Sequence, residues 1–127
     1  MKKNMNKGFS LVELIIVIAI MAVLVGILAP QFIKYVEQSK RATDIQNAQS
    51  YASAILTDVA SSNWDSATGI PTTMTAIPSI AGNGGNGSMS ASVNEALGIV
   101  TITITTGGTS YEVYPDAACA KAYKEAN

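Results

Sequence analysis

A length of 127 residues leaves room for one small domain, and a formal net charge of −1 gives no basic excess for binding nucleic acid. The chain contains no histidine and a single cysteine, Cys119, which excludes a histidine-based catalytic site and an intrachain disulfide. No Cys/His metal spacing occurs, and no glycine loop carries the lysine of a phosphate-binding site. We therefore expect a protein that is not an enzyme and that holds no metal or cofactor.

A basic leader precedes a long apolar run at the N-terminus. The leader ends at Gly8, the run begins at Phe9, and no charged residue occurs from Leu14 to Ile33, a stretch of twenty residues. At about 1.5 Å per residue, a helix of this length spans ~30 Å, the thickness of the hydrocarbon core of a bilayer. We predict a single membrane-spanning helix over residues 9–33, with the leader in the cytoplasm because lysines favour that side.

The boundary between leader and apolar run is the expected cleavage site. No A-x-A-like site follows the apolar run, so an ordinary signal peptide is not indicated. The residues across the boundary are Lys7-Gly8-Phe9-Ser10-Leu11-Val12-Glu13-Leu14. They resemble the processing site of type IV pilins and their pseudopilin relatives. The resemblance extends over about Lys7 to Pro30, and it implies that a membrane peptidase cuts between Gly8 and Phe9 and methylates the new N-terminal Phe9.

The same resemblance implies a structural role. The subunits would form a homopolymer, a helical filament with the apolar helices in its core. A prepilin peptidase/methyltransferase, an assembly ATPase and a platform membrane protein would assist its formation. The precursor would lie in the cytoplasmic membrane and the mature subunit in a cell-surface filament. A pseudopilin of a type II secretion or competence DNA-uptake system shares these features, but the Ser/Thr-rich C-terminal part without an acidic calcium loop favours a pilus. A membrane-anchored binding module that never polymerises predicts instead that Gly8 stays uncut.

Glu13 is the one carboxylate of the apolar run, and it lies one helical turn from Phe9. A buried carboxylate needs a cationic partner, which the new amine of Phe9 would supply after cleavage. The pair could form within one chain or between Glu13 of one subunit and Phe9 of the next. We hypothesise that the second pairing dominates and sets the axial register of assembly.

Gly26 and Pro30 mark a weak point in the predicted helix. The ring of Pro30 removes the hydrogen bond to the carbonyl of Gly26, the residue with the poorest helix propensity in the run. The segment could unwind during assembly or persist as a simple kink, and both readings predict the same sequence.

Residues 34–60 continue the helix with an amphipathic pattern. Apolar residues recur at three- and four-residue spacing, while charged residues including Lys40, Arg41, Asp44 and Asp58 occupy other directions. The predicted stripe consists of Ala42, Ile45, Ala48, Ala52, Ile55, Leu56 and Val59.

Residues 61–127 predict a small β-rich head with a connecting loop. Three alternating runs, at 89–93, 99–105 and 109–114, are separated by turn signals, and Pro115-Asp116 opens a helix from Ala117 to about Glu125. We expect Cys119 to be either a small buried residue of that helix or a site of intermolecular pairing, and we interpret the sequon at Asn86 as part of a loop. Loop residues expected to contact the core are Trp64, Ile70, Met74, Ile77 and Ile80.

The predicted fold is therefore α+β. A long N-terminal helix, with a membrane half and an amphipathic half, packs against a small three-stranded antiparallel sheet, and a short C-terminal helix completes the domain. The predicted segments are a cleaved leader at 1–8, the membrane or filament-core helix at 9–33, its amphipathic continuation at 34–60 and the head at 61–127.

Overall fold

The computed structural model describes residues 8–126 and confirms the predicted α+β fold. Helix α1 runs over Leu11–Ala60, three antiparallel strands follow, and helix α2 ends the described chain. The chain divides between Tyr35 and Val36 into two units, which we describe separately. We call residues 9–33 the apolar segment and residues 36–126 the folded unit.

The apolar segment is helical from Leu11 onward, and its large apolar side chains are exposed on every side. None of its residues is buried, and α1 is the one helix among residues 8–126 that is long and apolar enough to cross a membrane. Such a uniformly apolar surface is stable only when lipid or other apolar helices cover it. The helix continues without interruption through Gly26 and Pro30.

Within the folded unit, a hydrogen-bonded turn at Ser62 and Asn63 ends α1. Ser62 adopts a left-handed backbone conformation with φ of 58°, and its N–H donates to the carbonyl of Val59 at 3.2 Å. The N–H of Asn63 donates to the carbonyl of Asp58 at 2.8 Å. These two bonds form a Schellman motif, which closes the helix in the stretch where the sequence predicted its end.

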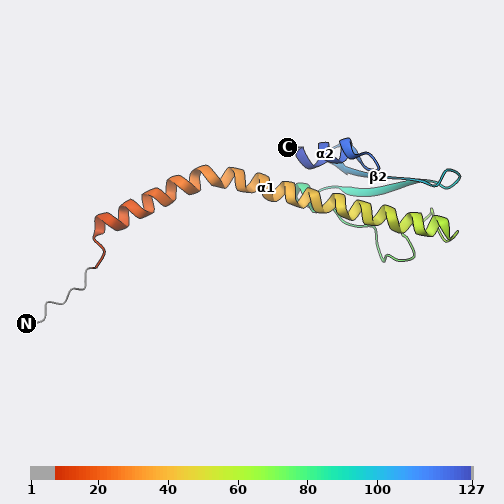
Figure 1. Ribbon diagram of the computed structural model, residues 1–127, viewed down its shortest axis with the longest axis horizontal. Coiled ribbons are helices and arrows are strands. Elements are labelled where there is room, and N and C mark those ends of the chain that lie inside the picture. Colours follow the sequence, from red (N-terminus) through yellow and green to blue (C-terminus); the bar gives the residue numbers. More distant parts are fainter. Residues whose placement is uncertain (1–7, 127) are drawn as a thin grey trace, which may run out of the picture. The chain divides into compact units, whose positions relative to one another are not determined.

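The sheet is an antiparallel meander in the order β1-β2-β3. Its strands are β1 (Ser88–Asn94), β2 (Ile99–Thr106) and β3 (Thr109–Tyr114), and the sheet lies along the second half of α1 (Figure 1). On β2, the alternation predicted from sequence is confirmed, since Val100, Ile102 and Ile104 are buried. The hydroxyl-rich face of the sheet is the outer one.

Strand β3 differs from the alternation read from its sequence. Strict alternation along 109–114 would place Tyr114 on the outer face beside Glu112, but Tyr114 packs against the core. The cause is an irregularity in the pairing between Ile102 and Thr103, where Thr103 pairs with Glu112 and Ile102 with Tyr114. A bulge of this kind moves the following side chain to the other face.

Helix α2 (Ala117–Glu125) begins at a side-chain cap and packs beside β3 (Figure 1). Asp116 accepts the backbone N–H groups of Ala118 and Cys119 at 2.8 and 3.2 Å, which satisfies two otherwise unpaired donors. The core that the helices and the sheet enclose consists of Ala48, Tyr51, Ala52, Ile55, Ile80, Met89, Val100, Ile102, Ile104, Val113, Ala120 and Tyr123.

The buried face of α1 is rotated relative to the predicted apolar stripe. Ala48, Ala52 and Ile55 are buried as expected, but other predicted members of the stripe are only half-buried. Three charged residues that were expected to face other directions are buried instead, and Tyr51 is buried with them. The buried face comprises Arg41, Asp44, Ala48, Tyr51, Ala52, Ile55 and Asp58.

Two buried polar groups of α1 hold the loop between α1 and β1 in place. The carboxylate of Asp58 accepts both the N–H and the hydroxyl of Thr72, and the hydroxyl of Tyr51 donates to the carbonyl of Gly69. Among the expected loop contacts, Ile80 is buried and Trp64 and Met74 pack against the core. Ile77 is exposed, so its predicted role as a core contact is wrong.

Candidate functional site

The start of α1 is fixed by a reciprocal pair of hydrogen bonds. The hydroxyl of Ser10 accepts the N–H of Glu13, and Oε2 of Glu13 accepts the N–H of Ser10, both at 3.3 Å. This arrangement is a capping box, in which Ser precedes the helix and Glu occupies its third position. The helix therefore begins at Leu11, and Gly8, Phe9 and Ser10 lie outside it.

Gly8 is a glycine that the described fold does not require. A Cβ at this position would meet no atom within 4 Å among the described residues. Phe9 beside it is 82% exposed. Since neither residue contributes packing in the structure, the identity of this pair is best explained by recognition outside the folded chain.

The other predicted site residues of the N-terminal half are also exposed. Gly26 and Pro30 both lie inside α1, and a Cβ at Gly26 would meet nothing within 4 Å. Oε1 of Glu13 makes no hydrogen bond within residues 8–126, so it is free to accept one from another group. The structure thus brings Ser10 and Glu13 together, and it leaves Phe9 and the apolar segment open to partners.

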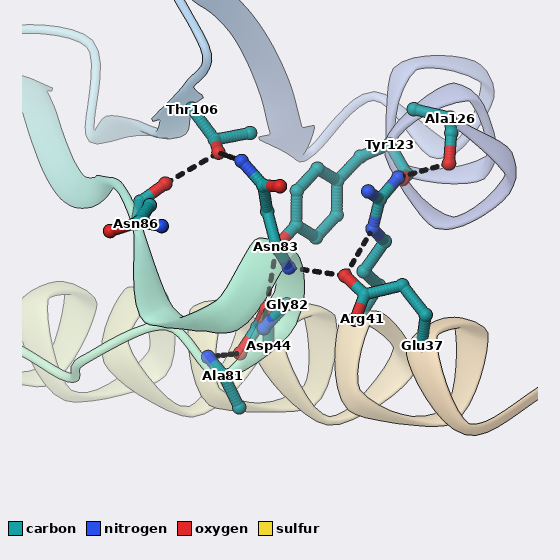
Figure 2. Close-up of polar contacts among 10 residues, drawn as sticks. All are labelled: Glu37, Arg41, Asp44, Ala81, Gly82, Asn83, Asn86, Thr106, Tyr123 and Ala126. Carbon is teal, nitrogen blue, oxygen red and sulfur yellow. Dashed lines mark hydrogen bonds and ion pairs between the residues drawn. The ribbon is translucent and has the colours of Figure 1, made fainter. Parts of the chain in front are cut away.

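A second polar site, which sequence reasoning missed, lies inside the folded unit. Figure 2 shows Asp44 of α1 facing the loop at Ala81 and Gly82 and the ring of Tyr123. We call Glu37, Arg41, Asp44, Gly82, Asn83 and Tyr123 the Asp44 cluster. Its members come from α1, from the short 3₁₀ helix η1 (Gly82–Gly85) and from α2.

The carboxylate of Asp44 is fully buried and accepts three hydrogen bonds. Oδ1 accepts the N–H of Ala81 at 2.6 Å, and Oδ2 accepts the N–H of Gly82 at 2.8 Å and the hydroxyl of Tyr123 at 2.5 Å. Hydrogen bonds to an ionised acceptor are stronger than neutral ones. Asp44 therefore joins α1, the loop and α2 at one point.

Arg41 ties the end of α2 to α1 (Figure 2). Its guanidinium donates to the carbonyl oxygens of Tyr123 and Ala126 at the end of α2, and it lies 5.6 Å from the centre of the Tyr123 ring. Its Nε also donates to Glu37 at 3.1 Å. The guanidinium is thus satisfied from three directions although the residue is buried.

Gly82 is required by this packing. A Cβ there would lie 2.6 Å from Cγ of Arg41, 2.7 Å from the hydroxyl of Tyr123 and 2.9 Å from Oδ2 of Asp44. The glycine-rich stretch at 82–87 forms η1 and the turn that follows it, and its first residue is buried. Asn83 beside it donates its N–H to Glu37 and its side-chain amide to Thr106. The hydrogen bond from the backbone N–H of Asn83 is the main reason that the pKa of Glu37 lies below 4.5.

We predict that the folded unit loses stability as the pH rises above about 10, and that Tyr123→Phe weakens this dependence. Burial and the hydrogen bond to Asp44 raise the pKa of Tyr123 above 10.0. The neutral phenol is therefore favoured in the folded state, and its contribution is present below the unfolded pKa and lost as the pH rises towards the folded pKa. Urea unfolding of the full chain in detergent, followed by Trp64 fluorescence, measures the effect.

Tyr35→Phe is the matched control, because Tyr35 is exposed. It should leave the slope of stability against pH unchanged, whereas Tyr123→Phe should also cost about 1.5–3 kcal/mol at neutral pH through the lost bond to a charged acceptor. An unchanged slope in Tyr123→Phe would contradict the prediction.

Cys119 is a half-buried free thiol on α2. The neighbouring carboxylate of Asp116 raises the pKa of this thiol. The thiol is less buried than the expected small buried residue of the terminal helix, and intermolecular pairing stays a prediction. Asn86 is exposed after η1, as its interpretation as a loop residue predicts.

Residues 3–29 match the family described as the prokaryotic N-terminal methylation motif. The chain carries the signature of type IV pilins and pseudopilins. This motif covers Gly8, Phe9, Glu13 and Gly26, and it implies processing by a prepilin peptidase and assembly into pilus-type filaments. The long helix, three-stranded sheet and short terminal helix match the pilin α+β fold. No curated protein and no solved structure matches the chain significantly.

Proposed function

We propose that this protein is the structural subunit of a type IV pilus-like extracellular filament. The precursor spans the cytoplasmic membrane once, with its N-terminus inside, and is cut after Gly8 and methylated at Phe9. The mature chain then polymerises through its apolar segment, assisted by an assembly ATPase and a platform membrane protein. The motif is typical of structural subunits rather than of enzymes.

The observation that carries the proposal is the exposure of the apolar segment. Its side chains from Phe9 to Ile33 are largely exposed around the whole circumference, and the motif matched at residues 3–29 supports a cleavage site ahead of them. A mature protein that keeps such a helix needs lipid before assembly and other apolar helices after it. A filament with these helices in its core meets the second need with copies of the same chain.

In this proposal, each of four segments of the chain has its own role. Residues 1–8 are the leader, residues 9–33 form the membrane and filament-core helix, residues 34–60 continue it, and residues 61–127 form the head at the filament surface. The pair Gly26 and Pro30 is the segment proposed to yield when the helix leaves the membrane, because Pro30 removes one hydrogen bond of that turn. A Cβ at Gly26 would meet no atom within 4 Å, so among the described residues no neighbouring side chain holds this turn in place.

The test is the mass and N-terminal sequence of the protein in sheared surface fibres. An abundant chain beginning at N-methylated Phe9 supports the proposal. Processed protein confined to the membrane fraction would favour a pseudopilin, and an uncut chain beginning at Met1 would overturn the assignment.

A matched pair of variants tests the role of Gly8. Gly8 and Gly26 both have room for a larger side chain in the structure. Gly8→Leu should therefore block cleavage without unfolding the protein, while Gly26→Leu should be cut as well as the unmodified chain. Equal cleavage of both variants would remove Gly8 from the recognised site.

A further inference from the structure

A groove of about 510 Å³ lies between α1 and α2 in the folded unit, and we call it the α1–α2 groove. Its apolar part consists of Ala42 and Ile45 from α1 and Ala120 from α2. Two lysines of α2, Lys121 and Lys124, line it as well. The groove therefore presents apolar surface and positive charge side by side.

The apolar part of the groove is a piece of the predicted stripe that the fold leaves uncovered. Ala42 and Ile45 lie at helical spacing in that stripe, but both are only half-buried. The buried face of α1 is rotated away from them, and at this level of the helix it consists of Arg41 and Asp44. Apolar residues at helical spacing that remain open on a folded unit are typical of a contact surface. We therefore looked for a partner that would cover them.

The charges of the groove restrict the chemistry of that partner. Neither Lys121 nor Lys124 makes an ion pair within residues 8–126, and Glu125 is the one acidic residue that lines the groove, which leaves a formal charge of +1 there. The folded unit as a whole is acidic, because residues 36–126 carry four basic and eight acidic side chains. A fitting partner offers an apolar group to the groove and a carboxylate to its lysines.

The turn between β1 and β2 offers this combination, and we call residues 95–98 the turn tip. Leu97 is 69% exposed and Ile99 beside it 49%, the highest values among the large apolar residues of the folded unit. Glu95 is exposed and makes no ion pair within residues 8–126. The N–H of Leu97 donates to the backbone and side-chain oxygens of Asn94, both at 3.2 Å, so the tip has a defined conformation.

The turn tip and the groove lie at different levels of α1. Glu95 shares a hollow with Val59 and Trp64, where α1 ends (Figure 1). The groove extends along α1 only as far as Gln49, and Val59 lies ten residues beyond it, about 15 Å along the helix. The tip therefore does not reach the groove of its own chain, and a contact between the two joins separate copies.

We propose that the turn tip of one copy binds in the α1–α2 groove of a second copy. Leu97 packs against the apolar part of the groove, and Glu95 pairs with Lys121 or Lys124. The contact joins two different patches of the same chain, so each copy keeps a free tip or a free groove for the next one. Such a heterologous contact produces an open chain of subunits unless its rotation closes a ring.

The inference rests on the proposed function, because it supplies a contact between the folded units of neighbouring subunits in a filament. The contact does not involve the apolar segment, so it can be measured in the full chain in detergent without cleavage or assembly. A negative result there would leave processing at Gly8 and fibre formation untouched. A failure of processing in cells would in turn leave this contact measurable.

Carbodiimide cross-linking tests the contact directly. The reagent activates a carboxylate and joins it to a touching amine as an amide, while the water that is lost converts the carbodiimide to a urea. Isotopically labelled and unlabelled full chains are mixed in equal amounts in a polyoxyethylene detergent, which carries neither group, and the digested product is analysed by mass spectrometry. We expect an amide between Glu95 and Lys121 or Lys124 that joins one labelled and one unlabelled peptide.

Leu97→Ser tests the apolar half of the contact while it keeps every reactive group. It should lower the yield of the mixed-label amide at least tenfold, because burial of the leucine side chain drives binding of the tip. Ile77→Ser is the matched control. Ile77 is also an exposed apolar residue of a loop, but it does not line the groove, so its substitution should leave the yield unchanged.

Three outcomes would overturn the proposal. The first is an absence of mixed-label amides between Glu95 and the two lysines, and the second is an equal yield from Leu97→Ser and the unmodified chain. The third is a mixed-label amide that forms as readily from Glu112, which is exposed on β3, as from Glu95. If the amide is absent and phosphatidylglycerol vesicles protect Lys121 and Lys124 from acetylation, the groove contacts a lipid surface instead.

Discussion

Asp44→Asn is expected to destabilise the folded unit by about 3–5 kcal/mol, because the amide cannot replace both carboxylate oxygens. Asn keeps one acceptor oxygen, so its NH₂ group would face either the N–H of Ala81 or the N–H of Gly82 and the hydroxyl of Tyr123. Bonds to a charged acceptor contribute about 1.5–3 kcal/mol each, and the donors left without one remain buried. The loss therefore includes both the bonds and the cost of unpaired donors.

The measurement is urea unfolding of the full chain in detergent, followed by the fluorescence of Trp64, which packs against the core. Asp65→Asn is the matched control. Asp65 is exposed and accepts hydrogen bonds from Ala67 and Thr68 in a local turn, a role that Asn also fills. Its free energy of unfolding should change by no more than about 0.5 kcal/mol. Similar losses of unfolding free energy in both variants would show that the buried hydrogen bonds of Asp44 contribute no more stability than those of the exposed turn at Asp65.

The elements of the fold were predictable because local patterns determine them. Alternation of Val100, Ile102 and Ile104 with threonines identifies β2, and the Pro115-Asp116 pair identifies the start of α2. Each of these signals lies within a few residues of the element it specifies. The N-terminal methylation motif was predictable for the same reason, since it is one continuous stretch of sequence.

The Asp44 cluster could not be predicted in this way. A helical pattern assigns charged residues to solvent, yet Asp44 and Arg41 are buried against distant partners. The partners of Asp44 lie 37, 38 and 79 positions further along the chain, and the carbonyl partners of Arg41 lie 82 and 85 positions further along. Gly82 lies in a run of Gly and Asn residues that is typical of exposed loops. Its identity is explained by the packing of Arg41, Asp44 and Tyr123 around it. A hint was available in the spacing of Arg41, Asp44, Ala48 and Tyr51, which continues the i, i+3, i+7 pattern of the buried face.

Glu13→Gln is expected to reduce incorporation of the subunit into filaments roughly a hundredfold or more, because we propose that the charge of Glu13 pairs with the amine of Phe9 in the neighbouring subunit. The capping box occupies Oε2 of Glu13, and Oε1 is left free to meet that amine. Both Ser10 and Glu13 remain after cleavage at Gly8, so the cap and the new pair can coexist. Breaking a buried ion pair costs about 3–5 kcal/mol, which sets the expected factor.

The choice of Gln separates two roles of the same side chain. Gln fills the third position of a capping box as Glu does, so Glu13→Gln keeps the cap and removes only the charge. Ser10→Ala does the reverse, since it removes one half of the cap and keeps the carboxylate. In cells that express the variant together with the unmodified subunit, fibres should contain Ser10→Ala chains and almost no Glu13→Gln chains.

The opposite ranking would show that helix capping, and not charge pairing, is what assembly requires of Glu13. Equal incorporation of both variants would show that neither contact sets the register. Either result would still leave cleavage at Gly8 intact, because the scissile bond lies outside α1 in a segment that makes no packing contacts in the structure. In this proposal, the register of assembly and the maturation of the precursor thus depend on neighbouring residues but on separate interactions.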